Sequence, residues 1–225
     1  MCGRFNLINS PEIQSLCETL GISLQASHES HDIAPGDKIS IIHNEAGVRK
    51  ISEAIWWLFL DKESLKPNYK YASFNSRSDK LFIQRAVAYK PFRESRCLIP
   101  ASAFVEGLGD KKTYHKIELE DSAIAFGGLY KEHLNRETGE IVHSASIITL
   151  PPLVPQWNEI HPKSMPLMLD FEDLDLVEKW LDPKVRDVEQ FEFLLDPKVS
   201  TPMKITKIDK PSKWNPIEES FMIQK

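Results

Sequence analysis

Cysteine is scarce in this sequence, which contains only Cys2, Cys17 and Cys97 among its 225 residues. An odd number of cysteines without close spacing argues against a disulfide framework and against a zinc knuckle. His28 and His31 have the spacing of metal ligands, but no third or fourth ligand is near them in the sequence, so a solvated loop is the better prediction. We therefore expect no metal site and no cofactor.

Long hydrophobic runs are absent as well. The first thirty residues are polar, which argues against a signal peptide, and no later stretch approaches the roughly 20 apolar residues of a transmembrane helix. The composition, 41% hydrophobic and 27% charged, is that of an ordinary globular protein. We expect a cytoplasmic protein that folds as a single domain over residues 1–225 and does not enter a membrane.

The net charge of −5 argues against a polyanionic partner, but the charges are unevenly distributed. Residues 62–96 contain nine basic and three acidic side chains, whereas residues 170–196 contain ten acidic and three basic ones. Such segregation can form a local basic face on an acidic protein, and a polyanion would bind there. Two solvated surfaces without a partner explain the same pattern, so charge alone does not choose between them.

The hydrophobic pattern predicts an α+β fold rich in antiparallel strands. Ser10, Pro11 and Gly21 mark an amphipathic helix as its N-cap, its first residue and its C-terminal cap. Further helices are expected at residues 78–90 and 171–181. The middle of the chain is rich in strands, and its short polar turns favour antiparallel pairing. We expect a barrel-like sheet flanked by helices.

Cys2 directly follows the initiator methionine, and a small second residue allows that methionine to be removed. Cys2 would then carry a thiol and a free α-amine, whose ordinary pKa values are about 8.5 and about 7.7–8.0. The amine can act as a base for its own thiol, as in N-terminal-nucleophile hydrolases. Alternatively, the amine can attack an aldehyde to form a Schiff base, which the thiol closes into a thiazolidine ring. Cys2 alone leaves both chemistries open.

Four other polar residues occur where a core does not require them. Asn75 and Arg77 share one side of an extended segment, because side chains alternate along a strand. Arg77 can bind phosphate through two nitrogens, and Asn75 can hydrogen-bond a backbone or substrate oxygen. Glu106 ends an apolar strand, where partial burial would raise its pKa and suit proton transfer. His161 stands just before a turn broken by proline.

Six blocks of the sequence, taken in order, carry a resemblance to a known family. They are "MCGRF", "FNSRSDK", "RCLIPASAFVEG", "AFGGLY", "SIITLPP" and "IHPKSMPLML". These blocks resemble the usual motifs of the SOS response-associated peptidase (SRAP) family. The resemblance runs from residue 1 to residue 169 and includes the cysteine at position 2.

This resemblance implies a function on DNA. SRAP proteins sense abasic sites, mainly in single strands and at junctions between single and double strands. Their N-terminal cysteine crosslinks to the ring-opened deoxyribose aldehyde as a thiazolidine. By resemblance, Cys2 is the nucleophile, and Asn75 holds the reacting sugar or the N-terminus. Glu106 and His161 move protons as the sugar ring opens, as the carbinolamine loses water and as the adduct reverses.

The resemblance also implies the DNA contacts and the extent of the activity. Arg4 and Arg77 would bind the phosphates that flank the lesion, and the protein would act as a monomer on single-stranded DNA. The word peptidase refers to the removal of residues ahead of the cysteine. We therefore expect self-processing and at most a weak lyase activity, without general proteolysis.

The sequence departs from the family pattern around these residues. Gly107 stands where the family usually has a tryptophan. The "HPKSMP" turn is one residue longer than usual and has Lys163 where an arginine is usual, so Lys163 is the expected phosphate contact. No tryptophan falls in the loop where relatives place a base-stacking wedge, which leaves Pro67, Tyr69 or Tyr71 for that role.

Two other functions fit parts of the sequence. A glutaminase-type amidohydrolase with an N-terminal cysteine nucleophile also begins Met-Cys-Gly. It would require oxyanion-hole donors and would hydrolyse amides without DNA. A DNA-binding module that uses only the basic residues would bind with strong salt dependence and form no covalent product. The ordered motifs favour covalent capture of abasic sites over both.

Overall fold

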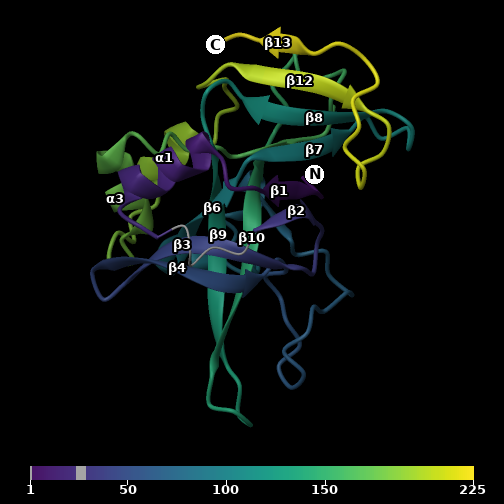
Figure 1. Cartoon of the computed structure of the whole chain (residues 1–225). Helices are drawn as coiled ribbons and strands as arrows, with labels where there is room; N and C mark the ends of the chain where they lie inside the picture. Colours follow the sequence, from purple (N-terminus) through teal and green to yellow (C-terminus); the bar gives the residue numbers. More distant parts are fainter. Residues whose placement is uncertain (1, 24–28) are drawn as a thin grey trace.

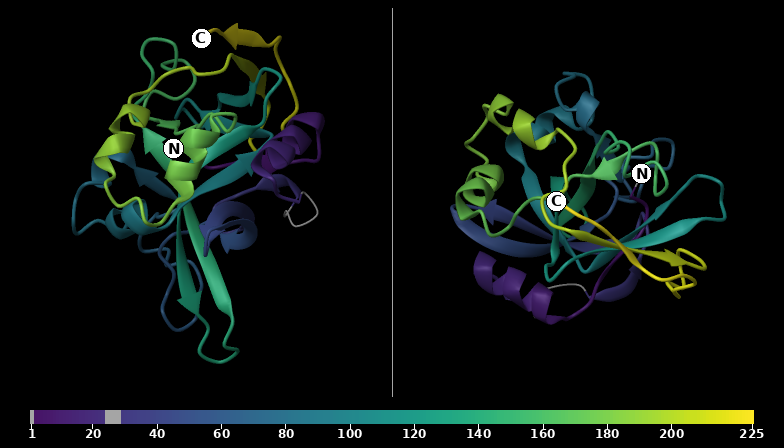
Figure 2. Two further views of the ribbon diagram at one scale, coloured as in Figure 1. Left: turned by 90° about the vertical axis from the view of Figure 1, so that its left-hand side faces the viewer. Right: turned by 90° about the horizontal axis from the view of Figure 1, so that it is seen from above.

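A computed structural model describes residues 2–23 and 29–225 of the chain, and His28 lies outside them. Strands and helices are both present, and most strand pairs are antiparallel, which confirms the expected α+β class (Figure 1). The helices lie at the periphery of the strands, and one long hairpin extends beyond the body of the molecule (Figure 2). Within the described residues, no helix is long and apolar enough to cross a membrane.

In the described part of the chain, five strands close into a barrel. They are β3 (Lys38–Glu45), β4 (Val48–Ile55), β6 (Arg96–Ala101), β9 (Ile124–Leu134) and β10 (Ile141–Leu150). The ring closes because β10 pairs with β9 on one side and with β4 on the other. β5 (Asn75–Arg77) and β11 (Met165–Pro166) extend the sheet by pairing with β10.

Two strand pairs depart from the expected antiparallel arrangement. β10 runs parallel to both β4 and β5, so the prediction from short turns is wrong along this seam. Short turns fix only the pairing of strands that are neighbours in sequence. Here the long stretch of chain between the strands supplies the crossover that a parallel pair needs.

A second sheet holds the beginning of the chain. Its strands, in spatial order, are β13 (Phe221–Ile223), β12 (Met203–Ile208), β8 (Tyr114–Leu119), β7 (Ala103–Gly107), β1 (Phe5–Leu7) and β2 (Ser30–Ile33). β1 lies between β7 and β2, so neighbours on both sides hold it. The ring of Phe5 makes edge contacts with Trp56 and Phe126 of the barrel, at centroid distances of 4.8 and 5.9 Å. This N-terminal segment is therefore firmly anchored, although chain ends usually fray.

The first helix forms as the sequence predicts. α1 (Pro11–Leu20) begins at Ser10, whose hydroxyl accepts a hydrogen bond of 3.4 Å from the N–H of Ile13. It ends at Gly21, whose φ of 64° lies in the left-handed region that glycine adopts without strain. Cys17 lies on the buried face of this helix, as expected for a small core residue.

The helix expected at residues 171–181 is also present but starts later. α3 (Leu174–Leu181) begins after Asp173, whose carboxylate accepts from the N–H of Leu176 and so caps the helix at that point. A short 3-10 helix, η3 (Glu189–Leu194), follows it.

The helix expected at residues 78–90 is wrong. The chain forms a short 3-10 helix, η2 (Ser78–Lys80), continues through tight turns and becomes α-helical only in α2 (Tyr89–Glu94). An amphipathic helix needs one continuous buried stripe of apolar residues. Several apolar side chains in this segment are instead partly exposed: Phe82, Ile83 and Val87.

One member of the basic stretch at residues 62–96, Arg96, lies in the interior and not on a basic face. Arg96 is 2% exposed, and its guanidinium donates to four backbone carbonyls. Two of them belong to Trp180, in the last turn of α3, and to Asp182, directly after this helix. Unpaired carbonyls at a helix C-terminus carry partial negative charge and need such donors. Arg96 therefore stabilises the fold from inside and offers nothing to a polyanion.

Candidate active site

Cys2 lies in the interior, three residues before β1, with an exposed fraction of 0%. The N–H of Val105 donates to the carbonyl of Arg4 at 2.8 Å, which aligns the start of the chain with the end of β7, where Glu106 stands. Burial raises the pKa of the Cys2 thiol well above its ordinary value, and the Glu106 carboxylate raises this pKa further. The thiol is therefore protonated at neutral pH in this environment.

Asn75 binds the backbone of Cys2 directly. β5 pairs with β10, and this pairing places the side chain of Asn75 so that its Nδ2 donates to the Cys2 carbonyl oxygen at 2.7 Å. The Oδ1 of Asn75 is buried and has no hydrogen-bond partner among the described residues. One end of the amide thus positions Cys2, and the other end is an acceptor ready for a donor that enters the site.

Glu106 and His161 lie side by side. Glu106 is 1% exposed, and its Oε2 is 3.8 Å from Nδ1 of His161. The same Nδ1 is 2.6 Å from the carbonyl oxygen of Gly107. Because a carbonyl can only accept, this contact places the proton of the neutral imidazole on Nδ1 and leaves Nε2 with its lone pair.

The pKa values of these two groups are shifted in opposite directions. Burial raises the pKa of Glu106 to about 7, whereas burial lowers the pKa of His161 below its ordinary value. Near neutral pH the site therefore holds a carboxyl group that can donate or accept a proton next to a neutral imidazole. Such pairs are typical of acid–base catalysis, because each group is poised for one direction of proton transfer.

The raised pKa of Glu106 makes a prediction for stability. The pKa of Glu106 is 4.5 in the unfolded chain and about 7 in the folded protein. A carboxyl whose pKa is raised on folding stabilises the fold below its unfolded pKa, and this contribution is lost as the pH rises through the folded pKa. Replacing Glu106 with glutamine removes the buried charge. We expect E106Q to raise the free energy of unfolding at pH 8 by up to about 3 kcal/mol and to change it little at pH 4.

Urea denaturation of both proteins at these two pH values measures this difference. An E106Q protein that is no more stable than the natural chain at pH 8 would contradict the raised pKa.

The structure accounts for the glycine at position 107. A side chain there would begin 3.1 Å from the ring of Tyr114, closer than ordinary packing allows. The Tyr114 ring thus occupies the space beside the backbone that a larger residue would need. The backbone carbonyl of Gly107 accepts the hydrogen bond from His161.

Arg77 and Lys163, the expected phosphate contacts, line one open cleft of about 550 Å³ together with Pro151 and Pro152. Arg77 follows Asn75 by two positions, and Lys163 follows His161 by two positions, but neither Asn75 nor His161 lines the cleft itself. The exposed guanidinium of Arg77 makes two hydrogen bonds of 2.9 Å to the carboxylate of Asp79. An anion that enters the cleft would compete with Asp79 for Arg77.

Arg4 has a partner that sequence reasoning missed. Its guanidinium forms an ion pair with Asp32 of β2, and both side chains are partly exposed. Asp32 is 28 residues away from Arg4, and it becomes a neighbour only because β2 pairs with β1. No local motif could have pointed to this pair.

The three residues expected to stack on a base lie in the segment between β4 and β5. Tyr69 and Tyr71 are 74% and 60% exposed, and each ring rests on an inner aromatic side chain, Trp57 for Tyr69 and Phe59 for Tyr71. Pro67 forms an isolated bridge with Leu60. The two tyrosines therefore present aromatic surface that is both accessible and supported from beneath.

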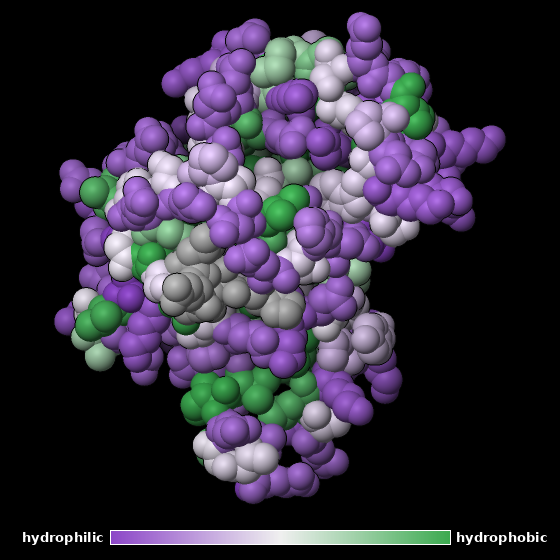
Figure 3. Space-filling view, viewed as in Figure 1, coloured by the Kyte–Doolittle hydropathy of each residue, from purple (hydrophilic) through white to green (hydrophobic). Residues whose placement is uncertain are grey.

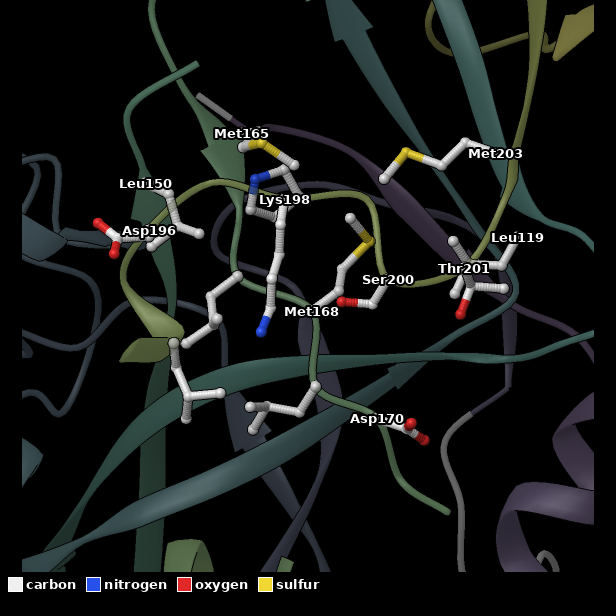
Figure 4. A pocket seen from close by; sticks show the side chains of 14 residues that line it. Leu119, Leu150, Met165, Met168, Asp170, Asp196, Lys198, Ser200, Thr201 and Met203 are labelled. Carbon is white, nitrogen blue, oxygen red and sulfur yellow. The ribbon is translucent and has the colours of Figure 1, made fainter. Parts of the chain in front are cut away.

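A separate cavity lies between β11, β12 and the segment that follows η3 (Figure 4). Methionine and leucine side chains line it, and Lys198 points into it. Its volume is about 30 Å³, which is the space of a water molecule and excludes a sugar or a nucleotide. The substrate site is therefore elsewhere.

Comparison with known proteins identifies the family of this chain. The family model described as "SOS response associated peptidase (SRAP)" matches residues 1–211. This chain belongs to the SRAP family. Its resemblance to that family, first read from six short motifs, is thus confirmed over most of its length.

Named relatives of this SRAP protein include two from Bacillus subtilis. The abasic site processing protein YobE is 30% identical over 205 residues, which cover 88% of this chain and 89% of the relative. The abasic site processing protein YoqW is 31% identical over 205 residues, which cover 88% of this chain and 87% of the relative.

Solved structures share the fold of this SRAP protein at lower identity. A protein from Bacteroides thetaiotaomicron superposes with a TM-score of 0.67 at 20% identity, covering 92% of each chain. A phage-related protein from Bordetella bronchiseptica gives a TM-score of 0.67 at 17% identity, covering 96% of this chain and all of the other. At these identities the likeness concerns the fold alone.

Proposed function

We propose that this SRAP protein processes abasic sites in single-stranded DNA by covalent capture. The capturing group is Cys2, after Met1 has been removed. The observation that carries the proposal is the position of Cys2, buried beside Glu106 and held through its carbonyl by Asn75. Two relatives named as abasic site processing proteins support the same substrate.

The proposed chemistry needs both groups of Cys2. The α-amine attacks the C1′ aldehyde of the ring-opened deoxyribose, and the resulting carbinolamine loses water to give an imine. The thiol sulfur then adds to the imine carbon while its proton passes to the nitrogen, which closes the thiazolidine. One water molecule is released overall, and no oxidant or reductant takes part. In the unprocessed chain the nitrogen of Cys2 is an amide, which cannot form an imine.

The buried residues fit the steps of this reaction. Glu106, with a pKa of about 7, protonates the departing hydroxyl of the carbinolamine and accepts a proton as the adduct reverses. His161 assists the opening of the sugar ring through Nε2, because its Nδ1 is engaged with Gly107. Asn75 fixes Cys2 through Nδ2 and accepts a hydrogen bond from a sugar hydroxyl at Oδ1.

The high pKa of the Cys2 thiol favours aldehyde capture over amide hydrolysis. A cysteine hydrolase needs a thiolate as its first nucleophile, and burial together with the charge of Glu106 disfavours that form here. In aldehyde capture the amine attacks first, and a neutral thiol can carry its own proton to the nitrogen in the closing step.

Single-stranded DNA would reach the site along the cleft that Arg77 and Lys163 line. The two cations bind phosphates on either side of the lesion, and Tyr69 or Tyr71 stacks on a neighbouring base. Junctions between single and double strands are included among the substrates. We propose that the protein acts as a monomer in the cytoplasm, that its peptidase activity is limited to exposing Cys2, and that any lyase activity is weak.

The proposed function is tested with a single-stranded oligonucleotide that carries one abasic site. Incubation with the mature protein is expected to give a protein–DNA band that survives a denaturing gel, and an oligonucleotide without the lesion is expected to give none. Glutamine turnover without a DNA adduct would instead establish an amidohydrolase. Salt-sensitive binding without any adduct would establish a simple DNA-binding module.

The phosphate contacts make a separate prediction. Replacing Arg77 or Lys163 with glutamine is expected to weaken the binding of lesion-free single-stranded DNA. The slope of the logarithm of the binding constant against the logarithm of salt concentration should fall by about 0.7 for each lost contact. Fluorescence anisotropy at several salt concentrations measures this slope. The control is Lys184→Gln, at an exposed lysine after α3, which should leave the slope unchanged. If R77Q and K163Q also leave the slope unchanged, Arg77 and Lys163 do not contact the phosphates.

A further inference from the structure

The loop between β12 and β13 has no role in the site described above. It covers residues 209–220, and its first part, residues 209–216, contains Lys210, Lys213 and Trp214. The family match ends at residue 211, so Trp214 lies beyond it. In Figure 1 this yellow loop hangs from the upper sheet toward β2.

The loop has a fixed shape. Asp209 accepts hydrogen bonds from the N–H of Lys210 at 2.6 Å and from the N–H and the side-chain amide of Asn215 at 3.3 and 3.1 Å. A bridge between Ile208 and Pro216 closes the first part of the loop, residues 209–216. The carboxylate of Asp209 is therefore used within the loop, and the loop presents its remaining side chains in a defined arrangement.

Trp214 is held in an unusual conformation within this loop. Its φ of 64° lies in the left-handed region, which bulky residues rarely adopt because it costs conformational energy. Its N–H donates to the carbonyl of Lys210 at 3.1 Å, and its indole Nε1 donates to Oδ1 of Asp32 at 3.2 Å. The ring is only partly buried. The fold thus fixes an aromatic side chain that remains accessible.

Asp32 connects Trp214 to the residues around Cys2. One carboxylate oxygen of Asp32 accepts from Trp214, and the other pairs with the guanidinium of Arg4. Arg4 is two residues from Cys2, and its carbonyl accepts from Val105, next to Glu106. Two residues of chain span at most about 7 Å, and the side chains of Arg4 and Asp32 bridge the rest of the way to Trp214. A strand of DNA whose lesion lies at Cys2 can therefore reach Trp214 within a few nucleotides.

The cations of the loop lie in its first part, whereas its acidic residues Glu218 and Glu219 lie nearer β13. Lys210 and Lys213 are exposed, whereas Lys207 at the end of β12 is paired with Glu218. Figure 3 shows mainly hydrophilic surface at the upper right, where this loop lies. Two exposed cations beside an accessible aromatic ring are the combination by which proteins bind single strands, with bases stacked on the ring and phosphates near the cations.

We propose that the β12–β13 loop is a second contact for single-stranded DNA, in which a base close to the lesion stacks on Trp214 and the flanking phosphates lie against Lys210 and Lys213. This inference rests on the proposed function for the position of the lesion. The loop's affinity for a lesion-free strand is independent of the crosslinking chemistry.

The experiment compares Trp214→Ala and Trp214→Phe with the natural protein. Anisotropy gives the Kd for a lesion-free single strand, and a denaturing gel gives the crosslinking of the same strand with one abasic site. W214A is expected to bind the lesion-free strand about tenfold more weakly, because it loses one stacked base. W214F is expected to bind within about twofold of the natural protein, because phenylalanine retains a stacking face. Phe193→Ala, which removes an exposed ring from η3, is the control and should bind normally.

The outcomes separate this inference from the proposed function. The loop contact would be overturned if W214A and the natural protein bind the lesion-free strand equally well, even if crosslinking occurs. It would also be overturned if the natural protein does not bind this strand at all. Equal losses in W214A and W214F would overturn stacking, because they would show that the indole N–H acts only as a structural link to Asp32. A loss in W214A alone, without crosslinking by any of the proteins, would support the loop contact and contradict covalent capture.

Discussion

Replacing Cys2 with alanine is expected to abolish the adduct with abasic DNA that survives denaturation. The mature variant keeps an α-amine and can still form an imine, but it has no thiol to close the ring. Its adduct should therefore be detected only when borohydride is added before denaturation, which traps imines. A denaturing gel of both proteins, with and without borohydride, measures the difference.

The other cysteines provide the control for this result. Cys17 is a core residue on α1, and replacing it with alanine should leave the adduct unchanged at a temperature where the variant is folded. A stable band from C2A without borohydride would show that another nucleophile captures the aldehyde. Loss of the band in C17A would show that the gel reports folding, not the chemistry of Cys2.

Replacing Glu106 with glutamine is expected to slow adduct formation by about 10²–10⁴-fold, which is the usual contribution of a positioned proton donor. Glutamine keeps the size of the side chain and removes its ability to donate a proton. In the natural protein, the rate should fall as the pH rises above about 7, because Glu106 then loses its proton. E106Q should lack this decline. Single-turnover rates between pH 5 and pH 9 measure both effects.

Glu118 offers a matched control for this substitution. It is a half-buried glutamate on β8, paired with Lys116 and outside the group around Cys2. Glu118→Gln should leave the rate and its pH dependence unchanged. A normal rate in E106Q would remove Glu106 from the chemistry. A slow E106Q that still shows the decline above pH 7 would assign that decline to another group.

Parts of the fold could be predicted from sequence because their signals are local. The cap at Ser10, the glycine at position 21 and the apolar spacing between them define α1 within a dozen residues. Hairpins such as β3–β4 depend on a turn and on the alternation next to it. In these segments, local preference and tertiary packing favour the same conformation.

The features that the sequence did not reveal depend on partners far apart in the chain. Arg96 looks like one member of a basic surface, but it is buried against carbonyls that lie 84 to 89 residues away. The parallel pairing of β10 and the ion pair of Arg4 with Asp32 likewise arise only after the sheets have formed. Residues 78–90 have helix-forming residues, but they lack a core that would cover one face of such a helix.

The residues proposed to act in catalysis illustrate the same difference. Their types and order suggested proton transfer by Glu106 and positioning by Asn75. The hydrogen bond from Asn75 to the Cys2 carbonyl and the contact between His161 and Gly107 required coordinates. Asp32 and Trp214 belong to no motif, and only the pairing of β1 with β2 and the path of the β12–β13 loop bring them near Cys2.

The most direct test of covalent capture by Cys2 is the mass and reactivity of the crosslinked N-terminal peptide. Protease and nuclease digestion of the adduct should yield a peptide that begins at Cys2, lacks Met1 and has gained the sugar fragment minus one water. Its thiol should resist alkylation, and borohydride should leave its mass unchanged, because the thiazolidine engages both sulfur and nitrogen. Any of three results would contradict the proposed chemistry: a sugar fragment attached to a lysine, a Cys2 thiol that can still be alkylated, or a crosslinked peptide that retains Met1.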